Sequence, residues 1–181
     1  MPTGRSIISR HLIGAFGSML LLISSASAAP PAQLYGKSVV VTWTDEVVHA
    51  LVGQEFFRSS HPSTMSVYIS TEGRPFVRHT TKVHQGTGVS EAVGTSGPHT
   101  VAFQGRALLV TTAYEGGASR VQIDFDGSFG NCTAAVIIGK APGASTFTVE
   151  KGLVTGRKWV VQSREAGPAT CSIKNGNVFA E

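Results

Sequence analysis

The stretch His99–Gly139 constrains the fold most, because it contains four short apolar-rich segments separated by three turns that carry glycine. Alternation is clearest in the third segment, where Val121, Ile123 and Phe125 fall on one face and polar residues fall on the other. Period-two patterning of this kind indicates a strand with one buried and one solvated face. Glycine at the turns tolerates the positive φ that short hairpin loops require. The stretch therefore predicts an antiparallel β-meander.

Segments rich in β-branched and aromatic residues occur on both sides of this meander. They predict strands over Gly36–Thr44, Thr64–Thr71, Pro75–Val83, Ser145–Glu150, Lys158–Arg164 and Ala169–Lys174. A total of about nine or ten short, closely spaced strands is typical of an all-β sandwich or barrel. We expect the antiparallel strands to close into a barrel, because closure removes exposed strand edges. A β-sandwich is the alternative.

Two segments are less regular. Asp45–Ser60 fits either a short helix or a continuation of the preceding strand, because its apolar residues have helical spacing but include glycine and β-branched valines. Gln85–Pro98 holds four glycines and a proline among serine and threonine. Such a composition predicts a long flexible loop.

Residues 1–28 have the pattern of a secretory signal peptide. Arg5 and Arg10 precede the apolar run Leu12–Ile23, and an A-x-A cleavage site ends at Ala28. The apolar run is shorter than the ~20 residues that a membrane-spanning helix needs. We therefore expect export by the general bacterial secretion pathway, a periplasmic or secreted location, and a single all-β domain over residues 29–181.

Charge argues against two classes of partner. The full chain has 15 basic and 11 acidic residues, and removal of Arg5 and Arg10 leaves 13 against 11, a net charge of +2 for residues 29–181. The sequence contains no cluster of four or more lysines and arginines. We expect no nucleic-acid partner, and no membrane partner after signal cleavage.

Cys132 and Cys171 are the only cysteines. In an exported chain an even count predicts one disulfide rather than reactive thiols. Closing a loop of about 40 residues stabilises a fold by about 4 kcal/mol in the chain-entropy description.

Carboxylates and histidines offer only weak site candidates. Asp124 and Asp126 share one strand face and would be close enough to hold a proton or a cation, but a solvated strand face next to a turn is the simpler interpretation. His84 and His99 bracket Gln85–Pro98, but a metal site built from them lacks a third ligand. We assign no metal and no cofactor.

Four aromatic residues are candidates for ligand binding: Trp43, Tyr68, Tyr114 and Trp159. In a closed sheet such side chains can line a cavity and stack on an apolar or sugar ligand. The alternative is that they simply fill the core.

Four segments carry a resemblance over nearly the whole mature chain: VVVTWT, the SVYIS-TEGR hairpin, IDFDGSFGNC and CSIKNGNVFA. Together with the signal peptide they resemble small exported proteins of rhizobial and related alphaproteobacteria. The resemblance implies a compartment and no activity.

The sequence favours an exported, non-catalytic β-domain that binds a small ligand or a protein partner. It contains no G-x-S-x-G motif, and no catalytic residue is assigned. A small periplasmic or secreted hydrolase remains an alternative, because triads also assemble from distant residues. A second alternative is an exported inhibitor-type module that engages its partner through Gln85–Pro98.

Overall fold

The computed structural model describes residues 28–51, 56–83, 86–93, 98–114, 116–151 and 158–180. The described chain is all-β and forms two antiparallel sheets. The larger sheet has seven strands: β1 (Lys37–Leu51), β2 (Phe56–Ile69), β3 (Pro75–Val83), β4 (Gly86–Val93), β9 (Thr148–Lys151), β10 (Lys158–Ala166) and β11 (Thr170–Asn175). The smaller has four: β5 (His99–Gln104), β6 (Ala107–Tyr114), β7 (Gly117–Phe125) and β8 (Cys132–Lys140). Two 3₁₀ turns, η1 (Ala32–Leu34) and η2 (Val178–Ala180), lie near the two ends of the described part of the chain.

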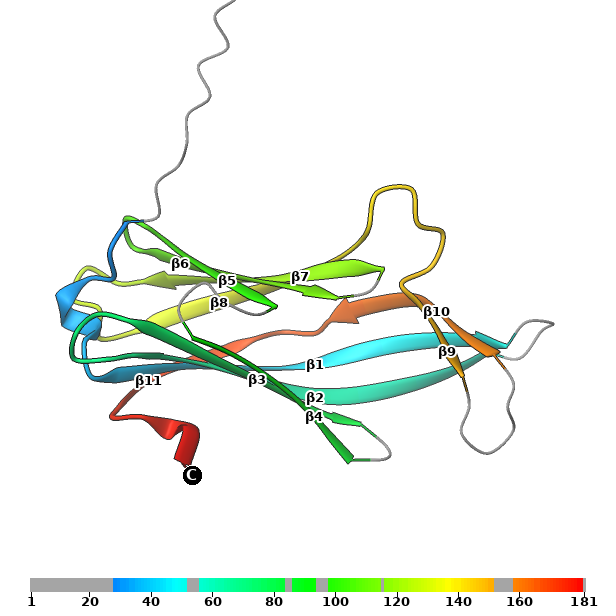
Figure 1. Cartoon of the computed structure of the whole chain (residues 1–181), viewed down its shortest axis with the longest axis horizontal. Coiled ribbons are helices and arrows are strands. Elements are labelled where there is room, and N and C mark those ends of the chain that lie inside the picture. The colour runs from blue at the N-terminus through cyan, green and yellow to red at the C-terminus, as the bar shows by residue number, and fades with distance from the viewer. Residues whose placement is uncertain are drawn as a thin grey trace, which may run out of the picture.

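Strand β1 organises the larger sheet, whose order is β4-β3-β2-β1-β10-β9. One edge of β1 pairs with β2 along most of its length. Its other edge is divided, because β11 pairs with Lys37–Thr42 and β10 pairs with Asp45–Leu51. Figure 1 shows the two sheets as stacked layers, with β1 and β2 running past the end of the four-stranded sheet.

The expectation of a barrel is wrong, and the alternative, a β-sandwich, is the better description. Among the described strands, none of the four-stranded sheet pairs with a strand of the seven-stranded sheet. Closure would require an edge strand of the meander, β5 or β8, to pair with an edge strand of the larger sheet, and no such pairing occurs among the described strands. The meander covers the larger sheet face to face instead.

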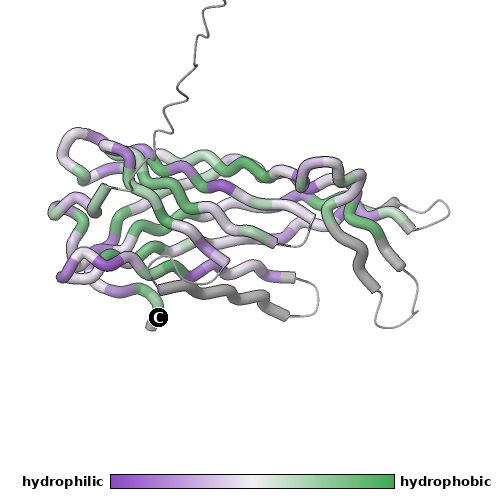
Figure 2. The backbone as a smooth tube through the Cα atoms, turned by 45° about the horizontal axis from the view of Figure 1, so that its top comes forward, coloured by the Kyte–Doolittle hydropathy of each residue, from purple (hydrophilic) through white to green (hydrophobic). Residues whose placement is uncertain are grey.

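The four-strand meander is confirmed, with β5 to β8 hydrogen-bonded in chain order. Val121, Ile123 and Phe125 of β7 are buried, whereas Arg120 and Asp124 are exposed. The main core lies between this face and the apolar residues of β1, β2 and β3, and Figure 2 shows hydrophobic residues recurring along the strands of both sheets.

Two irregular segments form strands. Where it is described, Asp45–Ser60 follows the strand interpretation, because β1 continues to Leu51 with a register shift between Val48 and His49, and β2 begins at Phe56. Residues 52–55 lie outside the described residues. The expectation of a loop over Gln85–Pro98 is wrong for Gly86–Val93, which forms β4 and pairs with β3, while residues 85 and 94–97 lie outside the described residues. A strand forms there despite the glycines, because strand preference depends strongly on context and the edge of β3 offers backbone groups to pair with.

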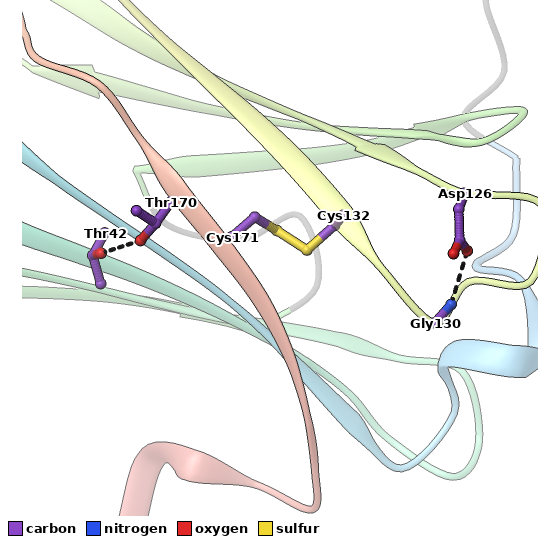
Figure 3. The surroundings of a disulfide bond; sticks show 6 residues. All are labelled: Thr42, Asp126, Gly130, Cys132, Thr170 and Cys171. Atoms are coloured by element: carbon purple, nitrogen blue, oxygen red, sulfur yellow. Dashed lines mark hydrogen bonds between the residues drawn. A yellow bond between two sulfur atoms is a disulfide. The ribbon is translucent and has the colours of Figure 1, made fainter.

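The disulfide between Cys132 and Cys171 is confirmed, with the two Cα atoms 5.6 Å apart. It joins β8 of the smaller sheet to β11 of the larger one, as Figure 3 shows. The bond therefore holds the two layers together at one side of the sandwich.

Candidate functional site

The inner face of the larger sheet changes from apolar to polar along β1. Val39, Val41 and Trp43 are buried in one phase of the strand, and Asp45 follows in the same phase with its side chain fully buried. The neighbouring strands change in the same way along the direction of β1. On the antiparallel strand β2 the change is from Met65 to Ser63, and on β3 it is from Val77 to His79. We call this region, with the facing part of the smaller sheet, the polar layer; its members from the larger sheet are Trp43, Asp45, Ser63, His79, Thr81 and Arg164.

The smaller sheet turns polar at the same level. His99, Thr112 and Ser119 are cross-strand partners on β5, β6 and β7, and all three are buried. His99 Nδ1 and Thr112 Oγ1 are hydrogen-bonded at 2.7 Å. The rings of His79 and His99 meet edge to face between the sheets, with centroids 6.3 Å apart. The polar layer is therefore continuous from one sheet to the other.

Asp45 is the centre of the polar layer. Its carboxylate accepts hydrogen bonds from Trp43 Nε1 at 2.6 Å, from Ser63 Oγ at 3.2 Å and from Arg164 Nη2 at 2.5 Å. The Arg164 side chain is 26% exposed, whereas that of Asp45 is 0% exposed. A buried carboxylate requires this degree of pairing, because an isolated charge in the interior is very costly. The contacts tie β1, β2 and β10 together at one point.

His79 is held as a neutral imidazole in this layer. Its ring stacks on Trp43 at 5.2 Å, and its Nε2 is hydrogen-bonded to Thr81 Oγ1 at 3.3 Å. The pKa of His79 is lowered from 6.5 to about 4, chiefly by burial, with His99 and Arg164 acting in the same direction and Asp45 in the opposite one. His79 therefore carries no charge near neutral pH.

Two buried polar atoms in this region have no hydrogen-bond partner among the described residues, namely Tyr114 Oη and Arg164 Nε. The Arg164 guanidinium lies over the Tyr114 ring, with Cζ 5.5 Å from the ring centroid. Burial raises the pKa of Tyr114, so the phenol stays protonated. Both side chains thus offer a hydrogen-bond donor, and an oxygen acceptor bound between the sheets is the kind of group that satisfies such donors.

A second cluster of polar side chains lies beyond the polar layer on β1 and β2, and it consists of His49, Ser59 and His61. Ser59 Oγ is hydrogen-bonded to His49 Nε2 at 2.9 Å and to His61 Nε2 at 2.7 Å. His61 Nδ1 is hydrogen-bonded to the Lys82 carbonyl at 3.2 Å. The Phe57 ring stacks on His49 with centroids 4.3 Å apart, and Phe57 is 42% exposed.

The four aromatic residues proposed for ligand binding do not gather at one site. Trp43 and Tyr114 lie at the polar layer. Tyr68 lies elsewhere, with its ring against Phe76 and Phe179. The side chain of Trp159 lies outside the described part of the structure.

The three weak metal candidates that the structure describes, Asp124, Asp126 and His99, lie in different surroundings. Asp124 is exposed and accepts from Gln122 Nε2 at 3.0 Å, while His99 is buried between the sheets. Asp126 caps its own turn by accepting from Ser128, Gly130 and Asn131, and Figure 3 shows the Gly130 contact. His84 lies outside the described residues. Within the described ranges, no group of three or more His, Cys, Asp or Glu side chains is placed to hold a metal ion.

Sequence reasoning missed Asp45, Ser59, His61, His79 and Arg164. For Asp45 the signal was present, because it continues the phase of Val39, Val41 and Trp43 and therefore places a charge on the buried face. The contact with Arg164 gave no such signal, since 119 residues separate the two in the sequence.

Comparison of the chain with protein-family models, with curated proteins and with solved structures gives no match in any of the three. Across the described ranges, the structure contains no helix with the length and apolar character needed to cross a membrane.

Proposed function

We propose that this chain is an exported β-sandwich that binds a small polar ligand in the polar layer between its sheets. The observation that carries the proposal is the pair of buried donors, Tyr114 Oη and Arg164 Nε, that lack a partner among the described residues. An unsatisfied buried donor costs about 1–3 kcal/mol, so two such donors on side chains that contact each other favour an occupant. Export is supported by the Cys132–Cys171 disulfide and by the signal-peptide pattern of residues 1–28.

The ligand is expected to offer an oxygen acceptor, such as a carboxylate, carbonyl or hydroxyl group. Arg164 is already paired with Asp45, so the ligand does not need a negative charge. Trp43 and the neutral His79 add a stacked, partly apolar wall beside it.

Native mass spectrometry tests the proposal on protein purified from its own compartment without reductant. A mass two hydrogens below that of the reduced chain reports the disulfide, and any further retained mass identifies the ligand. We expect a retained small molecule that carries oxygen. A bare oxidised chain would contradict the proposal and would leave water as the occupant.

Matched tyrosine variants locate the ligand. Tyr114→Phe removes the hydroxyl and keeps the ring, whereas Tyr68→Phe makes the same change outside the polar layer. We expect the retained mass to disappear in Y114F and to persist in Y68F. Loss in both variants, or in neither, would show that the ligand lies somewhere else.

A further inference from the structure

With both imidazole rings neutral, the hydrogen bonds around Ser59 fix the positions of the protons. A carbonyl only accepts, so His61 Nδ1 carries the proton that is donated to Lys82 O. In the neutral ring Nε2 then has a lone pair and accepts from the Ser59 hydroxyl at 2.7 Å. Ser59 Oγ in turn accepts from His49 Nε2–H at 2.9 Å. The serine hydroxyl is therefore aligned on a basic nitrogen, and a third group orients that base.

This arrangement is the one that activates a nucleophilic serine, with a base in hydrogen-bond reach and a further group that fixes its tautomer. We propose that Ser59 is a nucleophile and that the protein hydrolyses small esters. The inference stands on different residues from the proposed function and does not require it. Ser59 is not part of a G-x-S-x-G motif, which the sequence lacks, and it lies within strand β2.

The reaction uses only groups of this chain and water. Ser59 Oγ attacks the acyl carbon while its proton passes to His61 Nε2, and the imidazolium gives that proton to the departing alkoxide. The products of this step are an acyl-serine and a free alcohol. Water then attacks the acyl-serine with its proton taken by the same nitrogen, which releases a carboxylic acid and restores the hydroxyl.

The surroundings of Ser59 indicate the class of ester. Val47 is the cross-strand partner of Ser59, and it belongs to a buried apolar cluster with Phe147 and Val161. Ser59 itself is 6% exposed, but Phe57, two residues earlier on the same face, is 42% exposed. The neighbours of Ser59 on this side are thus apolar, and the same face reaches solvent at Phe57. The expected substrate is therefore an ester with a short apolar acyl chain.

A fluorophosphonate probe tests the nucleophile directly, because it loses fluoride as its phosphorus bonds to an activated serine. The folded, disulfide-intact protein is treated with the probe, and the modified peptide is mapped by mass spectrometry. We expect the label on Ser59. Ser59→Ala should abolish it, and Ser60→Ala is the matched control, because Ser60 is exposed and its hydroxyl donates to Glu46 at 2.6 Å.

A variant of His61, the proposed base, shows whether Ser59 is labelled because it is activated or merely because the probe can reach it. His61→Gln keeps a polar side chain but removes the proton acceptor, and loss of a general base slows such reactions by about 100-fold or more. We expect that decrease both in labelling and in hydrolysis of p-nitrophenyl butyrate, with circular dichroism unchanged. Absence of label on Ser59 in the folded wild type would overturn the inference. Equal labelling rates in wild type and H61Q would overturn it as well.

Discussion

Replacing His79 with glutamine tests whether the polar layer makes the sandwich sensitive to acid. In the folded protein His79 is held neutral, and its pKa is lowered from 6.5 to about 4 by burial and by His99. The unfolded chain binds a proton near pH 6.5, whereas the folded chain does not bind it until about pH 4. The stability that comes from the neutral ring is therefore fully present above pH 6.5 and is lost as the pH falls toward 4.

The size of the effect follows from the two pKa values. A difference of one pH unit between them corresponds to about 1.4 kcal/mol, so the limiting loss is about 3 kcal/mol. Between pH 7 and pH 4.5 the expected loss is about 2 kcal/mol, since protonation of the folded state is still incomplete there. The charged groups that face His79 are Asp45 and Arg164, and they oppose each other in their effect on its pKa.

Urea unfolding of wild type and His79→Gln at pH 7, 6, 5 and 4.5 measures this contribution. Glutamine retains a hydrogen-bonding group toward Thr81 but does not titrate. We expect the free energy of unfolding of the wild type to fall relative to that of H79Q by about 2 kcal/mol across this range. Parallel curves for the two proteins would refute the reasoning, because other titrating groups are common to both.

Two further predictions concern stability. Cys132→Ser with Cys171→Ser should lower the free energy of unfolding by about 4 kcal/mol, because it releases a closed loop spanning 39 residues; an unchanged urea midpoint would show that the bond does not constrain the unfolded chain. Asp45→Asn should cost about 3–5 kcal/mol, because it leaves Arg164 without its buried partner, whereas Asp124→Asn at an exposed position should stay within about 0.5 kcal/mol. Similar losses in both Asp variants by thermal unfolding would contradict the central role of Asp45.

The site was harder to predict than the strands that carry it. The alternation on β1 already places Asp45 on the buried face, and the same phase rule brings His61, Ser63 and Met65 to one face of β2. The alternation of residues within a strand does not show which strands become its neighbours in the sheet. Tyr114 and Arg164 belong to different sheets, and they meet only because the layers stack.

The amino-acid sequence by itself determined the all-β class, the meander over β5 to β8 and the pairing of Cys132 with Cys171. The strands follow from local alternation and turn residues, and two cysteines allow only one disulfide pairing. The tertiary structure decided between sandwich and barrel, made a strand of Gly86–Val93 and assembled the polar layer. Each of these depends on which backbone edge is free and on which face is covered, and contacts between residues far apart in the chain settle both.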